Sequence, residues 1–392
     1  MRVLRASVGA TVLLAGQLVV AGGASATPSV LTVSADQPSA VPIGHNWSFN
    51  DFFPRRLTVH TGATVDFELL SFHTATLLPA GVSSAQGTLA HPIAVADTDD
   101  ANRNPNGTTT AALNAGALLP TSFTCGTSLN PCAYDGSSLV SSGVPQGPTG
   151  SFYATITAKP GTYTFICLVH PKMHGTIHVV DADDRVDTAT SVAARAATQI
   201  KSDVLAGRAA ESAANHARLT VDDGVRTWWL KAGTGTPDGH VAILEMLPRS
   251  VDIRKGDRVA WTSPAVNEPH TVTFPVDMGS EFQPSCEGAG GVDTPAAPNH
   301  LPPQGLFDFN CGGGPFDEVA VDGGNGVRTL TSNATVSDSG FLTSRTWNRL
   351  IGLPQSGSLH RWTVSIAANA TAGTYTYVCQ IHDGMAGALV VH

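Results

Sequence analysis

The chain has 392 residues, of which 14% are charged, and its formal net charge at pH 7 is −9. This acidic and sparsely charged composition argues against the basic surface that nucleic-acid binding requires. The length is sufficient for two domains. Glycine and proline are abundant, with 40 and 25 residues, and β-branched runs alternate with turn residues, which predicts strands joined by long loops.

The N-terminus has the pattern of an export signal. Two arginines precede an apolar stretch at 6–21, and Ala24-Ser25-Ala26 forms a small-residue cleavage site. This pattern predicts a signal peptide over the first 26 residues, cleaved after Ala26. A retained membrane anchor is the alternative, but the stretch is short for a span and contains Gln17. No later run approaches membrane-spanning length, so we expect a secreted or extracytoplasmic product without a membrane span.

Residues 27–181 are expected to form the first domain. PRRLTVHTGATVDFELL at 54–70 reads as two strands around a glycine turn, because apolar and polar residues alternate. SFHTATLLP follows, and SFYATITAKPGTYTF at 151–165 predicts two more strands. The last strand breaks off into CLVHPKM, where a cysteine, a histidine and a methionine stand at three-residue steps. A stretch at 80–150, rich in Gly, Pro, Asn and Ser, reads as a long loop insertion.

The composition changes at 182–222, which we assign to a helical linker. Its alanine-rich segment places apolar residues at steps of three and four, which predicts one amphipathic helix or two helices meeting near Gly207. The apolar positions are Val186, Ala189, Val192, Ala193, Ala196, Ile200 and Val204. The pattern fits a simple spacer as well as a packed bridge.

Residues 223–392, the expected second domain, repeat the features of the first in the same order. PRSVDIRKGDRVAWTS at 248–263 matches the strand, glycine turn and strand of 54–70. HRWTVSIAANATAGTYTY matches the later strand pair, CQIHDGM returns the spacing of CLVHPKM, and a second loop insertion lies at 275–355. A repeat of this length predicts duplication of a whole domain. We therefore expect an all-β chain, with two β-sandwiches joined by the alanine-rich helical segment.

Six cysteines are present, and two of them stand in the repeated motif. The other four fall in pairs, Cys125 with Cys132 in the first insertion and Cys286 with Cys311 in the second. In an exported protein such pairs predict two disulfides, Cys125–Cys132 and Cys286–Cys311. Free thiols are the alternative, which export disfavours.

The repeated motif supplies a soft set of metal ligands. A thiolate, a neutral imidazole and a weakly binding thioether together select copper over magnesium or calcium. Zinc accepts Cys and His but does not normally take Met. A type 1, or blue, copper site places two His and one Cys around the ion with a distant axial Met. Each half therefore needs a second histidine, and His73 and His270 each open a His-Thr-x-Thr segment after the glycine-turn strands.

The sequence thus predicts two copper ions per chain, one in each domain. The predicted ligands are His73, Cys167, His170 and Met173 for the first ion, and His270, Cys379, His382 and Met385 for the second. Only five methionines are present in the chain, including Met1, so their recurrence at both axial positions is specific.

On these residues the chain resembles the cupredoxins, the family of type 1 copper proteins. The matching stretches are GATVDF and GDRVAW, the two His-Thr-x-Thr segments, and the ends GTYTFICLVHPKM and GTYTYVCQIHDGM. The tight C-x2-H-x2-M loop is similar to that of amicyanin. The resemblance leaves out the insertions and the helical segment. It implies a Greek-key β-sandwich in each half, with copper held near one end by the ligands above, and an electron port near the surface at His170 and His382.

One-electron transfer is the predicted function, because the ligand set leaves no open position for a substrate. Copper storage or delivery is the nearer alternative, and an interaction protein stabilised by copper is a third. A copper oxidase or nitrite reductase is a remote alternative, since the sequence has no His-x-His pair and Ile166 and Val378 precede the ligand cysteines. We therefore expect no enzyme activity. The expected partners are copper ions and an unidentified redox protein, without nucleic acid.

Overall fold

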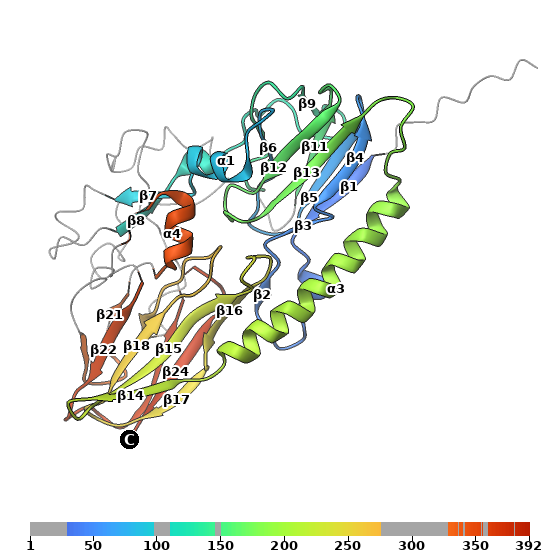
Figure 1. Cartoon of the computed structure of the whole chain (residues 1–392). Coiled ribbons are helices and arrows are strands. Elements are labelled where there is room, and N and C mark those ends of the chain that lie inside the picture. The colour runs from blue at the N-terminus through green and yellow to red at the C-terminus, as the bar shows by residue number, and fades with distance from the viewer. Residues whose placement is uncertain are drawn as a thin grey trace, which may run out of the picture.

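The computed structural model describes residues 30–97, 110–145, 150–275, 328–335, 337–339, 342–353, 355, 360–379 and 381–392. The described residues form two β-sandwiches with a long helix lying beside both (Figure 1). This architecture confirms the predicted all-β fold class. The predicted Cys286–Cys311 disulfide lies outside the described residues.

The first sandwich consists of two five-stranded sheets within the described part of the chain. One sheet has, in spatial order, β3 (Phe52–Phe53), β1 (Leu31–Ala35), β5 (Thr64–Leu69), β11 (Gly150–Ile156) and β9 (Cys132–Tyr134). The facing sheet has β10 (Val140–Ser141), β6 (Thr76–Leu77), β12 (Gly161–Ile166), β13 (His174–Val180) and β4 (Arg56–His60). Parallel and antiparallel pairs are mixed, because β1 runs parallel to β5 and β4 runs parallel to β13.

Side chains that alternate along the strands fill the space between these sheets. Phe67 of β5 and Phe165 of β12 are fully buried, and their ring centroids lie 5.3 Å apart at a steep angle. Burying one such side chain stabilises the fold by roughly 1.5–3 kcal/mol. This core fixes the two strands whose ends support the first candidate site.

The second sandwich also has two sheets. One contains β2 (Trp47–Ser48), β16 (Ala242–Leu247), β15 (Val225–Gly235), β18 (Arg258–Thr262), β22 (Trp362–Ile366) and β20 (Arg328–Leu330), with β14 (Arg218–Asp222) paired to β15. The other contains β17 (Ser250–Ile253), β24 (Ala386–Val391), β23 (Gly373–Val378), β19 (Thr273–Phe274) and β21 (Ser337–Asp338). Trp261 and Tyr377 meet between the sheets, with ring centroids 5.2 Å apart.

The strand pairings of the two sandwiches correspond. The parallel pair β1–β5 corresponds to β15–β18, and the antiparallel hairpin β12–β13 corresponds to β23–β24. The edge pairings β10–β6 and β21–β19 correspond as well. The loop after β12 and the loop after β23, which carry the two ligand motifs, therefore leave their sandwiches at equivalent positions.

Two short segments make the division between the halves less simple than the sequence predicts. Strand β2, from the first half, pairs with β16 of the second sandwich through Trp47 and Ser48. Strand β14 lies at the end of the expected linker and pairs with β15. The helical part of the linker is accordingly shorter than 182–222, and the first half contributes an edge strand to the second sandwich.

Helix α3 (Ala189–Ala214) is a single continuous helix rather than two. Thr188 caps its N-terminus by accepting the backbone N–H of Ser191, and the Ser191 side chain returns a contact to Thr188. Gly207 lies inside the helix and faces the ring of Trp47. A larger residue would not fit there, since a Cβ at this position would come 2.8 Å from that ring. The apolar positions Ala196, Ile200 and Val204 pack against the same cluster as Trp47. The helix is thus a packed bridge. Among the described helices, none has the length and hydropathy needed to cross a bilayer.

The insertions contribute the smaller elements, and those of the two halves meet. These elements are α1 (Ser84–Ala90), β7 (Ala94–Asp97), β8 (Thr110–Leu113), α2 (Ala115–Leu118) and α4 (Arg345–Ile351), while the 3-10 helix η1 (Pro38–Ala40) lies outside the insertions, between β1 and β2. Helix α4 comes from the second half but lies beside α1 (Figure 1). Its Trp347 and Ile351 belong to the core of the first sandwich. The halves are therefore joined by side chains as well as by the linker.

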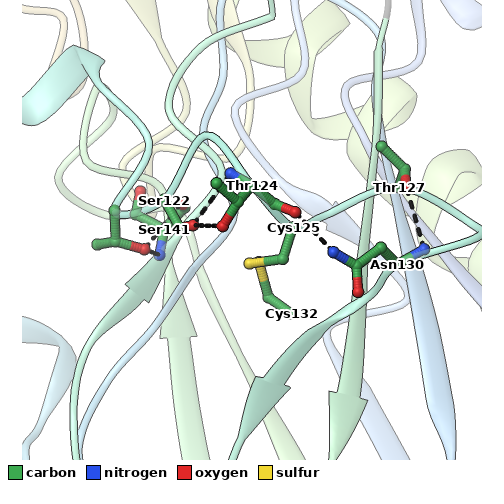
Figure 2. Close-up of a disulfide and its surroundings, with 8 residues drawn as sticks. Ser122, Thr124, Cys125, Thr127, Asn130, Cys132 and Ser141 are labelled. Atoms are coloured by element: carbon green, nitrogen blue, oxygen red, sulfur yellow. Dashed lines mark hydrogen bonds between the residues drawn. A yellow bond between two sulfur atoms is a disulfide. The ribbon is translucent and has the colours of Figure 1, made fainter.

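The predicted Cys125–Cys132 disulfide is confirmed, with an S–S distance of 2.00 Å. It joins the start of β9 to the preceding loop. Asn130 closes this loop by donating its amide to the carbonyl of Thr124 at 2.6 Å, while its backbone N–H donates to Thr127 Oγ1 at 3.1 Å (Figure 2). The bridge therefore secures the insertion to the edge of the first sandwich.

Candidate metal centres

His73, Cys167 and His170 form one buried group at the end of the first sandwich. His73 lies in the loop between β5 and β6, and the other two residues lie in the loop between β12 and β13. The Nδ1 atoms of His73 and His170 are 3.8 and 3.5 Å from Cys167 Sγ. All three predicted residues are thus brought together, although His73 and Cys167 are 94 residues apart in the sequence.

His270, Cys379 and His382 form the corresponding group in the second sandwich. The Nδ1 atoms of His270 and His382 are 4.0 and 3.5 Å from Cys379 Sγ, and 3.1 Å from each other. A reciprocal pair of backbone hydrogen bonds with Leu342 holds His270 in place. The second group therefore has the same atoms facing one another as the first.

The spacing of these atoms fits a single metal ion in each group. Ligand atoms that bind one ion at about 2.0–2.3 Å in a trigonal arrangement lie roughly 3.5–4 Å apart. The S–N distances of 3.5–4.0 Å are in this range, and the ligand atoms of each group all lie within 4.8 Å of one another. Two imidazoles and a thiolate in this arrangement are the equatorial donors of a type 1 copper site.

The two predicted axial methionines are buried in the same loops. Met173 and Met385 are 0% and 1% exposed. In the first loop the Cys167 N–H donates to the Met173 carbonyl at 2.9 Å, and in the second the Cys379 N–H donates to the Met385 carbonyl at 2.9 Å. Each C-x2-H-x2-M segment is therefore a closed turn, which explains why its spacing is tight.

The threonine after each upstream histidine connects that histidine to the cysteine. The backbone N–H of Thr74 points at Cys167 Sγ at 3.4 Å, and that of Thr271 points at Cys379 Sγ at 3.3 Å. Thr74 Oγ1 also accepts the N–H of Leu168 at 2.7 Å. The N–H donors stabilise a thiolate and fix its direction, and the hydroxyl contact gives Thr74 a role that requires its side chain.

The surroundings favour the thiolate form of both cysteines. Burial alone would raise the pKa of Cys167 and of Cys379, but the neighbouring histidines lower both pKa values well below the ordinary value of 9.0. His170 and His382 lead these effects. A thiolate is the form that binds a soft metal, and a bound metal ion would replace the histidine protons as the positive charge beside it.

One carboxylate lies between the two groups. Glu268 Oε1 is 2.9 Å from His170 Nε2, and Glu268 Oε2 is 3.4 Å from His382 Nε2. Burial opposes the protonated form of each histidine, yet Glu268 and the adjacent cysteine raise both histidine pKa values to about 10. The outer edges of these rings consequently face a buried carboxylate between the halves. This arrangement differs from the expected electron port near the surface.

The upstream histidines have unequal surroundings. His73 Nε2 is 3.7 Å from Asp36 Oδ2, which is too long for a hydrogen bond but close enough for a strong electrostatic contact. Burial lowers the pKa of His73, but Asp36 and Cys167 raise it overall, whereas burial dominates and lowers the pKa of His270. The two candidate sites therefore have the same types of ligand residue but differ in local charge.

Two other groups of acidic and histidine side chains serve as ion-pair networks. They consist of Asp51, Asp203 and His240, and of His45, Glu211 and Glu245. Arg55 contacts both carboxylates of the first group at 2.6 and 3.3 Å, and Arg249 contacts Glu245 of the second at 2.9 Å. An arginine thus supplies the cation in each, and both groups attach α3 to neighbouring strands.

The sequence prediction did not include Glu268 or Asp36. Comparison of the halves contained a signal for the first, because Glu268 stands two residues before His270 whereas Ser71 stands two residues before His73. For Asp36 the local sequence offers no comparable signal. Its proximity to His73 depends on the parallel pairing of β1 with β5.

No family model and no curated protein matches the sequence. Among solved structures, the chain is similar to auracyanin from Roseiflexus castenholzii, with 21% identity over 39% of this chain and 97% of that chain, and a TM-score of 0.23. Plastocyanin from Dryopteris crassirhizoma is 21% identical over 38% of this chain and 99% of that chain, with a TM-score of 0.18. A copper-containing nitrite reductase from Thermus scotoductus is 12% identical over 86% of this chain and 59% of that chain, with a TM-score of 0.18.

The strand pairing is that of a β-sandwich in each half, and the fold is cupredoxin-like.

Proposed function

We propose that this chain is an exported protein that holds one type 1 copper ion in each half and transfers single electrons. The observation that carries the proposal is the burial, in each half, of a cysteine sulfur with two imidazole Nδ1 atoms around it. The donor set is soft and suits copper. The proposed ligands are His73, Cys167, His170 and Met173, and His270, Cys379, His382 and Met385.

The protein's contribution is to keep these donors fixed. Each cysteine is held by its N–H bond to the methionine carbonyl of the same loop and by a threonine N–H directed at its sulfur. The surrounding strands are packed by aromatic cores, so the donor atoms have little room to move. When bound, copper would supply a one-electron redox couple. A site that needs little rearrangement between oxidation states favours fast electron exchange.

Export is part of the proposal. The N-terminal signal pattern supports cleavage after Ala26 and a secreted or extracytoplasmic location. The Cys125–Cys132 disulfide also supports an oxidising compartment, in which such bonds persist. The partner would be a second redox protein.

Copper storage or delivery is the second candidate, because the same ligands would also retain copper without passing electrons. An oxidase or nitrite reductase is a weaker candidate. Such an enzyme needs additional histidine-bound copper, and the two other histidine-containing groups found among the described residues each hold an arginine ion pair.

Repeated redox cycling distinguishes these candidates. Copper-loaded protein would be reduced and reoxidised with small-molecule reagents while its visible spectrum is followed, and then exposed to a copper chelator. Electron transfer predicts fast and reversible cycles with the copper retained, and the Cys167→Ala/Cys379→Ala double variant should not cycle. Rapid release to the chelator with poor cycling would instead support storage or delivery. More than two coppers per chain with turnover of oxygen or nitrite would support an enzyme.

A further inference from the structure

Glu268 is a buried carboxylate that contacts one candidate ligand from each half. It lies in the loop between β18 and β19 and is 6% exposed. Each of its oxygens faces a different histidine, His170 at 2.9 Å and His382 at 3.4 Å. Asn50 donates its side-chain amide to Oε1 at 2.8 Å. The carboxylate is thus contacted by both halves of the chain.

The backbone around Glu268 is fixed independently of the carboxylate. The adjacent Asn267 accepts the backbone N–H of Lys172 at 2.9 Å and donates to the carbonyl of Gly239 at 2.5 Å. Lys172 Nζ donates to the Pro237 carbonyl at 2.7 Å. Lys172 belongs to the first ligand loop, between His170 and Met173. The interface therefore holds the first ligand loop and the Glu268 loop against each other.

The contacts place Glu268 where it acts on the ligands through their far ring nitrogens. Nδ1 of His170 and of His382 faces the cysteine of its own group, and Nε2 of each faces Glu268. Each of these two imidazoles can therefore bind a metal on one side and donate Nε2–H on the other. A carboxylate acceptor at that position fixes the orientation of the ring and makes the ligand nitrogen more basic. Because one residue supplies this acceptor to both rings, its effect extends to both sites.

We propose that Glu268 is a shared positioning residue, which sets the copper affinity and the reduction potential of both sites through His170 and His382. This inference rests on the proposed copper function and adds a dependence of the two sites on one side chain. Glu268 binds neither metal in this scheme. Its negative charge stabilises the oxidised ion more than the reduced ion, so the charge lowers both potentials.

The test measures each site alone. Glu268→Gln would be introduced into the Cys379→Ala protein, which retains only the first site, and into the Cys167→Ala protein, which retains only the second. Copper(II) affinity is measured by competition with a chelator, and the potential by spectroelectrochemistry. The proposal predicts a loss of affinity of about 10–100-fold and a higher potential at both sites.

Asn267→Ala is the matched control, because it removes contacts across the same interface but keeps the carboxylate. It should shift both potentials much less than Glu268→Gln does, because the negative charge remains beside the two histidines. Glu268→Asp, which keeps the charge but withdraws the oxygens, should shift both sites in the same direction as Glu268→Gln and provides the test if the glutamine variant does not fold. A shift at only one site, or equal shifts in Asn267→Ala, would overturn the proposal. Absence of copper binding in the two parent proteins would instead contradict the proposed function.

Discussion

Asp36 and Gly233 occupy corresponding positions in the two sandwiches. Asp36 directly follows β1 and Gly233 lies in β15, the strands that run parallel to β5 and β18. Asp36 stands five residues after the residue that pairs with Val65, which is Leu31. Gly233 likewise stands five residues after the residue that pairs with Val259, which is Trp228. Both have positive φ angles, 72° and 70°. The backbone thus takes the same course beside each site, but only the first site has a side chain there.

The difference falls next to the upstream ligand of each site. Asp36 places a carboxylate 3.7 Å from His73 Nε2, whereas His270 Nε2 faces the α-carbon side of Gly233. Burial raises the pKa of Asp36, but contacts with His73, with Ser71 and with the Phe49 N–H lower it overall, so the group is ionised at neutral pH. The first site therefore has an additional negative charge.

Asp36→Asn should raise the reduction potential of the first site only. The carboxylate stabilises the more positive oxidised ion, and asparagine keeps the shape and tolerates a positive φ. At an effective dielectric constant near 20 the loss is about 1–2 kcal/mol, or roughly 40–90 mV for one electron. Spectroelectrochemistry on the Cys379→Ala background measures it. Ser71→Ala, which removes a 2.7 Å hydrogen bond to Asp36 but keeps the charge, is the control. An unchanged potential in Asp36→Asn would disprove this role.

Gly233→Ala should disrupt the second site and spare the first. A Cβ at this position would lie 2.0 Å from His270 Nε2, so the histidine must move away from Cys379. The positive φ adds roughly 1–2 kcal/mol of backbone strain. Copper titration with visible spectroscopy should show about half of the thiolate band lost.

Gly224→Ala separates strain from displacement in this experiment. Gly224 has a φ of 79° with nothing within 4 Å of its Cβ position, so it imposes similar strain without a clash. We expect Gly224→Ala to bind two copper ions normally. If both variants lost the band equally, the close approach of Gly233 to His270 would not be the cause.

Asp187 pairs with Arg195 of α3 and accepts the backbone N–H of Thr58 in β4. We expect the stability that these contacts contribute to be lost at acidic pH. Burial raises the pKa of Asp187, but Arg195 and the Thr58 N–H lower it below its ordinary value of 3.8. A lowered folded-state pKa contributes stability above pH 3.8, and this contribution is lost as the pH falls further. Asp187→Asn should therefore reduce the free energy of unfolding at pH 7 by about 0.5–1 kcal/mol, since Arg195 is solvent-exposed.

Urea unfolding of metal-free wild type and Asp187→Asn at pH 7 and pH 3 measures this effect. The difference between the two proteins should shrink at pH 3, while Asp183→Asn, at an exposed aspartate nearby, should show none. A difference that stayed constant over this range would assign the loss to packing and not to the charge of Asp187.

The two candidate groups could be located from the sequence because most of their spacing is local. Cys167, His170 and Met173 stand within one turn, and His73 follows a recognisable strand. The strand pattern likewise predicts the sandwiches, since alternation reports which side chains are buried. The repeated motif made the second group as clear as the first.

The contacts between the halves could not be predicted in this way. The pairing of Trp47 with Ile243, the packing of Trp347 on the first core, and the position of Glu268 between two histidines all join segments far apart in the sequence. No periodicity encodes such contacts. They depend on how the second sandwich docks, which local propensity does not determine. The electron port near the surface was predicted from the resemblance to the cupredoxins. The sequence gives no sign that the two histidines face Glu268 between the docked halves.

Copper reconstitution of wild type, Cys167→Ala and Cys379→Ala, followed by visible spectroscopy and metal analysis, tests the two-site assignment most directly. The account predicts two coppers per wild-type chain and an intense thiolate-to-copper band that falls by about half in each variant. A colourless copper-loaded protein, or a loss of the band confined to one of the two variants, would contradict it.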